Sequence, residues 1–140
     1  MTEPRAELAR RIDIIERGYE YLLAFAAQGR RNEAGSEVRA TLLAMHAALE
    51  NLQRIVMANG HGKDPAQRHD DSAFMDAVGD DARKASGAIA FTLNCGTIGS
   101  QLIDNLNASI HVRALLTDLF LADQALRQGE PPVEQASAKT

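Results

Sequence analysis

Residues 36–59 read SEVRATLLAMHAALENLQRIVMAN, and their apolar positions recur with the period of an α-helix. These positions step by four, three, four, three and four, and they are Val38, Leu42, Met45, Leu49, Leu52 and Val56. Such steps place all of these side chains in one narrow stripe of a helix. Ser36 can cap the first turn, and Asn59 followed by Gly60 is a stop signal. The stretch predicts one amphipathic helix that buries this stripe inside a helical domain.

The stretch before it carries a matching stripe. Its members are Leu8, Ile12, Ile15, Tyr19, Leu22 and Ala26, and they fall in a helix predicted over residues 2–28 and ended by Gly29. Two helices with the same apolar spacing and a short polar connection favour a hairpin. We therefore expect helices 2–28 and 36–59 to lie side by side.

The first predicted helix also has a second apolar line. Ile14, Tyr21 and Phe25 lie at i, i+7 and i+11, well away from the first stripe. A helix with two apolar faces needs two neighbours. The second neighbour is either another helix of the same chain or a second subunit. We take Ile14, Tyr21 and Phe25 as candidate partner contacts and expect a homodimer.

Two more helices are predicted in the second half of the chain. The third begins at Asp71 or Ser72 and carries Phe74, Val78, Ala85, Ile89 and Leu93 on one side. A break is expected at residues 94–97, because Gly96 can adopt a left-handed cap and Thr97 can cap the next helix; the alternative is one continuous helix. The fourth helix is predicted from Ile98 to Arg127, with a broad apolar arc.

Two segments lack apolar periodicity. Residues 60–71, GHGKDPAQRHDD, predict a long loop; its His and Asp residues match no metal-ligand spacing, so no metal site is expected there. Residues 128–140, QGEPPVEQASAKT, contain two adjacent prolines and little to bury, which predicts a disordered C-terminal tail.

Composition places the chain among the all-α proteins. It has 140 residues, is 45% hydrophobic and only 4% aromatic, and shows almost no alternating pattern typical of strands. We expect one domain over residues 1–127, followed by the tail at 128–140. The predicted architecture is an antiparallel four-helix bundle with a long loop between its second and third helices.

Charge and apolar content exclude several classes of partner. The net charge is −4, and basic residues are scattered, so nucleic acid is not an expected partner. No apolar run approaches the roughly 20 residues that span a bilayer, so no membrane association is expected. The single cysteine and the charged N-terminal segment, which does not resemble a secretory signal, favour the cytoplasm.

Polar residues on the predicted helix 98–127 are the candidate ligand contacts. Arg113 projects between Leu102 and Leu106 on the apolar arc, where a permanently charged guanidinium needs a carboxylate or an anionic ligand. Asp104, Asn107 and His111 lie at i, i+3 and i+7 on the opposite face. This polar line is either a solvated face or a proton-transfer or metal constellation.

No catalytic residue, metal or cofactor is predicted. The Glu-x-x-His pairs of a di-iron bundle are missing, and the glycines near residue 99 lack the lysine of a phosphate-binding loop. We therefore predict a non-enzymatic interaction protein: an adaptor, export-type chaperone, assembly factor or regulator that acts as a dimer. The alternative is a small-molecule-binding or enzymatic bundle with a polar site around Arg113 and His111. A closed polar cavity around Arg113 favours the alternative, and an exposed apolar surface favours the interaction protein.

Overall fold

The computed structural model describes residues 3–59 and 71–128, and every regular element in those ranges is a helix. The helices are α1 (Glu3–Ala26), α2 (Val38–Ala48), α3 (Leu52–Ala58), α5 (Ser72–Leu93), α6 (Ser100–Ala108) and α7 (His111–Gln128). The all-α prediction is confirmed. Within the same ranges, none of the helices combines the length and apolar character that crossing a bilayer requires. The predicted loop at 60–71 and tail at 128–140 fall outside the described residues, except for Asp71 and Gln128.

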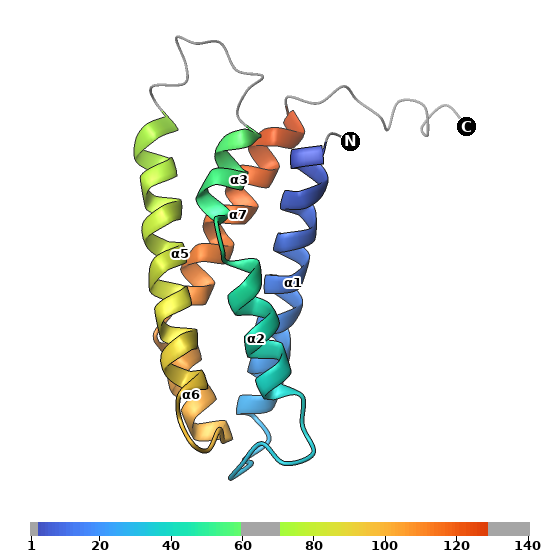
Figure 1. Cartoon of the computed structure of the whole chain (residues 1–140), viewed down its shortest axis with the longest axis vertical. Coiled ribbons are helices and arrows are strands. Elements are labelled where there is room, and N and C mark those ends of the chain that lie inside the picture. The colour runs from blue at the N-terminus through green and yellow to red at the C-terminus, as the bar shows by residue number, and fades with distance from the viewer. Residues whose placement is uncertain (1–2, 60–70, 129–140) are drawn as a thin grey trace, which may run out of the picture.

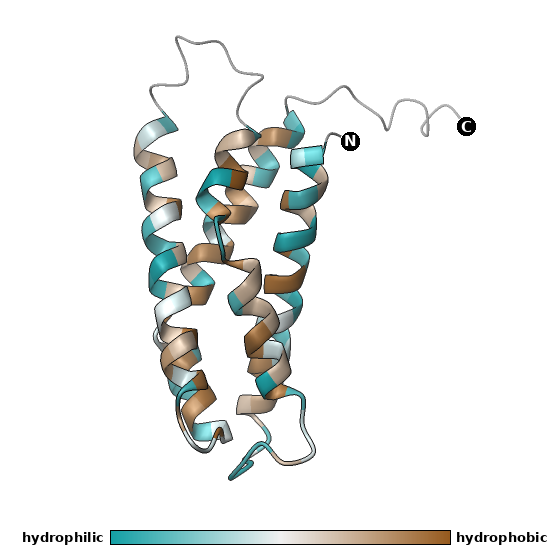
Figure 2. Ribbon diagram, in the orientation of Figure 1, coloured by the Kyte–Doolittle hydropathy of each residue, from teal (hydrophilic) through white to brown (hydrophobic). Residues whose placement is uncertain are grey.

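The helices run back and forth along the long axis of the molecule (Figure 1). α1 descends in this view, α2 and α3 ascend, α5 descends, and α6 and α7 ascend again. α1 and α5 each pack against α2 and α3 on one side and against α6 and α7 on the other. Brown, hydrophobic segments recur along the helices (Figure 2). The core side chains come from all six described helices and from the segment between α5 and α6.

The apolar stripe of residues 38–56 is buried along its whole length, as predicted. However, the single helix predicted there is wrong, because α2 ends at Ala48 and α3 begins at Leu52. Asn51 adopts a left-handed conformation with φ of 57° at the break, which asparagine tolerates better than most residues. Arg11 of α1 donates from Nη1 to the carbonyls of Ala48 (3.1 Å) and Glu50 (2.8 Å). This side chain satisfies backbone groups near the break.

The predicted continuous helix from Ile98 to Arg127 is also wrong. α6 ends at Ala108 and α7 begins at His111, with Ile110 at φ of 63° between them. The Ser109 hydroxyl donates to the Leu106 carbonyl at 2.6 Å. It thereby supplies a hydrogen bond to one of the last carbonyl groups of α6. The break changes which side of the following helix faces the core. The buried residues of α7 are Val112, Leu115, Leu116, Leu119 and Ala122.

The predicted break after α5 is confirmed, although its capping differs. Gly96 does not take a left-handed conformation, and the residue before α6 is Gly99 and not Thr97. Ser100 joins this segment to the end of α1: its hydroxyl donates to the Phe25 carbonyl (2.6 Å) and accepts from the Arg30 amide (2.8 Å). A Cβ on Gly99 would lie 2.9 Å from the Arg31 carbonyl oxygen. The two connections at this end of the molecule are therefore in direct contact.

Two glycines within helices lie where neighbouring helices come into close contact. A Cβ on Gly18 of α1 would lie 2.5 Å from Cγ and Sδ of the buried Met45 on α2. A Cβ on Gly79 of α5 would lie 2.6 Å from the Gln53 side chain, whose Nε2 donates to the Met75 carbonyl at 2.9 Å. These two glycines allow α1 to approach α2 and α5 to approach α3.

We expect Gly18→Ala to lower the free energy of unfolding by about 1 to 3 kcal/mol, because the added methyl overpacks the α1–α2 contact. Gly87→Ala is the matched control, since it also lies within a helix but its Cβ would meet no atom within 4 Å. It should raise stability by roughly 0.4 to 1 kcal/mol. Urea denaturation of both variants measures the difference. If both variants gained stability equally, α1 and α2 would not be in close contact at Gly18.

Candidate functional site

The structure divides the predicted polar residues between α6, which carries Asp104 and Asn107, and α7, which carries His111 and Arg113. Arg113 is exposed on α7, which corrects its predicted place in the apolar arc, and Asp104 is exposed on α6. His111 is half-buried at the first position of α7. Asn107 is also half-buried, and its Nδ2 donates to the Leu22 carbonyl at 3.3 Å. The break at residues 109–110 separates these residues onto two helices, and Asn107 links α6 to α1.

The side chains of the second apolar line of α1 largely pack against other parts of the same chain. Phe25 is fully buried, and its ring centroid lies 6.3 Å from that of Tyr21 and 5.6 Å from the Arg30 guanidinium carbon. The Tyr21 hydroxyl accepts a hydrogen bond from the Glu37 amide at 2.9 Å. Ile14 is half-buried against the same core. Phe25 is therefore a core residue in this structure and not a surface contact.

One cavity of about 600 Å³ lies between the end of α1 and the start of α6. Arg30, Arg31 and Asp104 supply its charged groups. Arg30 is already engaged, because its Nε donates to the Gln28 side chain (2.7 Å) and its Nη1 to the Ala34 carbonyl (3.1 Å). The hydrogen bonds of Arg30 thus hold the connection after α1 in place.

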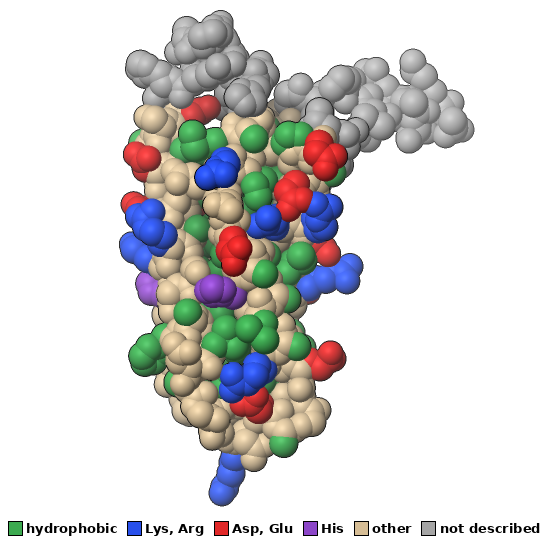
Figure 3. Space-filling view, viewed as in Figure 1, with side chains coloured by type: hydrophobic (Ala, Val, Ile, Leu, Met, Phe, Trp, Pro, Cys, Tyr) green, Lys and Arg blue, Asp and Glu red, His purple; other side chains and the backbone are tan. Residues whose placement is uncertain are grey.

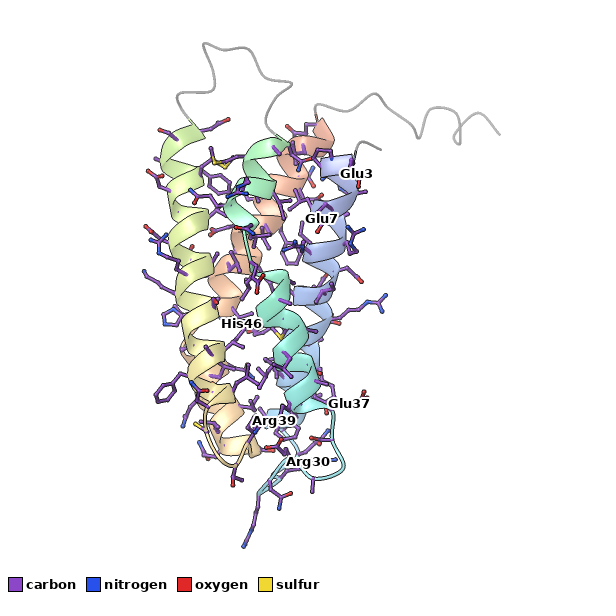
Figure 4. All side chains as sticks on the ribbon, in the orientation of Figure 1. Glu3, Glu7, Arg30, Glu37, Arg39 and His46 are labelled. Atoms are coloured by element: carbon purple, nitrogen blue, oxygen red, sulfur yellow. The ribbon has the colours of Figure 1, made fainter. Side chains whose placement is uncertain are left out.

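A second arginine stabilises the same end of the molecule, where Figure 4 labels both Arg30 and Arg39. Arg39 donates from Nε (2.6 Å) and Nη2 (2.9 Å) to the two carboxylate oxygens of Glu33, and from Nη1 to the Leu93 carbonyl (3.0 Å). The hydrogen bond from Arg39 lowers the pKa of Glu33. This cluster ties α2 to the end of α5 and is structural.

An apolar groove of about 170 Å³ lies between α3, α5 and α7, near the end of the molecule where α1 begins. We call it the α3–α5–α7 groove; its lining residues are Val56, Asp71, Phe74, Met75, Leu121, Ala122, Ala125 and Leu126. Among the described residues that line it, Asp71 alone is charged, and Leu121 is 59% exposed on its α7 side. An open groove of this kind can accept apolar side chains from another molecule.

Apolar spacing placed Val56 and Phe74 on the buried sides of predicted helices. Phe74 and Leu121 belong to predicted apolar faces, and nothing in their spacing distinguishes a buried position from a groove wall. The groove forms because α3, α5 and α7 come together only in the folded chain. In the folded chain Phe74 and Met75 are half-buried and Leu121 is exposed, which the spacing alone does not predict.

A carboxyl pair between α5 and α7 was also missed. Asp81 of α5 is half-buried and interacts with Asp118 of α7, which is half-buried as well. Burial, followed by the interaction with Asp81, raises the pKa of Asp118 to about 7. No sequence motif signals such a pair, because its members are 37 positions apart (118 − 81).

The described residues contain no group of three or more His, Cys, Asp or Glu side chains arranged to hold a metal ion. The chain matches no protein-family model, no curated protein and no solved structure. Its function is therefore argued from its own surfaces. Among these, the α3–α5–α7 groove is the candidate functional site.

Proposed function

We propose that this chain is a non-enzymatic interaction protein that binds a protein partner through the α3–α5–α7 groove. Adaptor, export-type chaperone, assembly factor and regulator are the roles that fit this class. The observation that carries the proposal is a groove lined almost entirely by apolar side chains, with Leu121 exposed on its α7 side. Its small volume suits a few apolar side chains from one face of an amphipathic helix.

The remaining surface supports this proposal over an enzymatic one. Large hydrophobic side chains are exposed elsewhere too, including Leu43 of α2 and Phe120 of α7. On the face that carries α2, hydrophobic side chains (green) lie among charged ones (Figure 3). Catalytic groups must lie within hydrogen-bond reach of one another or of one substrate. Arg113 is exposed, and neither Arg113 nor His111 lines the cavity between α1 and α6 or the α3–α5–α7 groove.

The proposal also includes a bundle architecture, a homodimer and a cytoplasmic location, and each rests on a different observation. The back-and-forth course of the helices in Figure 1 supports an antiparallel four-helix bundle in which α2 with α3, and α6 with α7, each take the place of one helix. A homodimer stays a prediction, although the burial of Phe25 removes part of its original basis. A cytoplasmic location is proposed because the single cysteine, Cys95, is free.

A photo-crosslinking amino acid placed at Leu121 tests the partner-binding proposal in the cells that produce the chain. We expect one discrete crosslinked product from position 121. Phe91, which is 72% exposed near the C-terminal end of α5, is the matched control site and should give none. If the crosslinked product is a second copy of the chain, the partner is the chain itself and the homodimer is supported. Absence of any product at position 121, or equal products at both sites, would contradict the proposal.

A further inference from the structure

Asp118 is placed where an ionised carboxylate is poorly stabilised. It lies on α7, which packs closely against α5. Its Oδ2 atom is buried and has no hydrogen-bond partner among the described residues. A buried carboxylate oxygen without a donor disfavours the charged form. The group across the interface is the carboxyl of Asp81, which adds negative charge.

The cations of α1, α3 and α6 do not compensate for this charge. In α3 the one cation, Arg54, is exposed. In α1, Arg5 binds Asp123, Arg10 and Arg11 bind Glu7, and Arg17 binds Asp13. α6 contributes one charged side chain, the exposed Asp104.

The cations of α5 and α7 do not bind Asp118 either. On α5, Arg83 binds Asp80, and Lys84 is exposed. On α7, Arg127 binds Asp123, Arg113 is exposed and His111 is half-buried nearly two turns before Asp118. Burial and Asp81 alone account for the raised pKa of Asp118. The proton of Asp118 is therefore lost close to neutral pH in the folded chain.

We propose that Asp81 and Asp118 form a proton-controlled latch, which holds α5 against α7 while Asp118 is protonated and weakens this contact when Asp118 loses its proton to water as the pH rises. The unfolded chain protonates Asp118 with an ordinary pKa near 4, whereas the folded chain does so at about 7. Between these values the folded state binds more protons than the unfolded state. The contribution of Asp118 to stability is therefore present at low pH and falls as the pH rises from about 4 to about 7.

The latch lies beside the α3–α5–α7 groove. Asp118 is about one turn before Leu121 and Ala122 on α7, and Asp81 is nearly two turns after Met75 on α5. Because α5 and α7 supply opposite walls of the groove, loosening their contact changes its width. This consequence for partner binding rests on the function proposed above, whereas the latch itself does not.

Urea denaturation between pH 5 and pH 8.5 tests the latch. Wild type should lose stability as the pH rises toward 7, and Asp118→Asn, which keeps the shape but cannot titrate, should show a flatter profile. Asp80→Asn is the control, because Asp80 is the exposed neighbour of Asp81 and pairs with Arg83. It should keep the wild-type dependence. Identical profiles for wild type and Asp118→Asn would overturn the proposal.

A carboxyl NMR titration keeps the test decisive if Asp118→Asn does not fold. The Asp118 signal in wild type should titrate with a midpoint near 7, so that about half of the chains carry the proton at neutral pH, against about 0.1% for an ordinary aspartate. Asp81→Asn should move this midpoint downward. A wild-type midpoint near 4 would overturn the proposal.

Crosslinking at Leu121 across the same pH range separates the latch from the groove. If the yield of crosslinked product changes with pH in wild type but not in Asp118→Asn, the latch controls partner binding at the groove. If the Asp118 titration is confirmed and the yield does not change, the latch stands and its link to the groove is wrong. If no crosslink forms at any pH while Asp118 titrates near 7, the proposed function is wrong and the latch still stands.

Discussion

Phe25→Ala is expected to lower the free energy of unfolding by about 3 to 5 kcal/mol. The side chain is fully buried, packs beside the Tyr21 ring and lies beneath the Arg30 guanidinium. The backbone around it has little freedom to collapse into the space left behind, because the Phe25 carbonyl accepts the Ser100 hydroxyl at 2.6 Å. Urea denaturation of the purified variant measures the loss.

Phe91→Ala is the control for this prediction, since Phe91 is a phenylalanine on the surface of α5. It should cost less than about 0.5 kcal/mol, as surface substitutions usually do. If the two substitutions have equally small effects, Phe25 is not a core residue. The interpretation of Ile14, Tyr21 and Phe25 as a subunit contact would then regain its support.

Leu49→Ala is expected to cost about 2 to 5 kcal/mol, although Leu49 lies in the turn between α2 and α3 and not within a helix. Its side chain is buried in the same core as Met45 and Leu52. Glu50→Ala should cost less than about 1 kcal/mol, because the Glu50 side chain is exposed. Its carbonyl, which accepts from Arg11, is unchanged by the substitution.

Chemical denaturation of the two single variants decides this prediction. A small loss shared by Leu49→Ala and Glu50→Ala would show that the turn between α2 and α3 is loosely packed. The burial of the full stripe from Val38 to Val56 would then be wrong at its centre. A large loss for Leu49→Ala alone is the result that the packing predicts.

Apolar spacing predicted which residues of 36–59 are buried but not where the helix breaks. The stripe remains buried through the turn at residues 49–51 because Leu49 keeps right-handed helical backbone angles before Asn51 turns left-handed. Asparagine is a recognised signal for this conformation, so Asn51 offered a clue. Arg11 offered none, since its bonds to the Ala48 and Glu50 carbonyls exist only after α1 has packed.

The break at residues 109–110 had no comparable signal. A β-branched residue such as Ile110 is among the least expected at a positive φ. Extending one helical projection across it therefore put Arg113 on the apolar arc, whereas Arg113 is exposed. The wrong placement of Arg113 followed from this single change of helical phase.

The α3–α5–α7 groove and the Asp81–Asp118 pair were out of reach of the sequence for another reason. Each depends on which helices become neighbours, and local periodicity does not contain that information. Phe74 was correctly placed on the apolar side of α5, but its position at the groove follows from the approach of α3 and α7. Asp81 meets Asp118 only because α7 packs against α5.

The most direct test of the groove as a partner site is a binding titration with the protein segment that crosslinks at Leu121. Wild type, Leu121→Asp and Phe91→Asp are compared under identical conditions. Burying a new carboxylate in an apolar contact should raise the Kd of Leu121→Asp by about tenfold or more, equivalent to about 1.4 kcal/mol. Phe91→Asp should stay within about twofold of wild type. Unchanged binding by Leu121→Asp, or a larger loss for Phe91→Asp, would contradict the account.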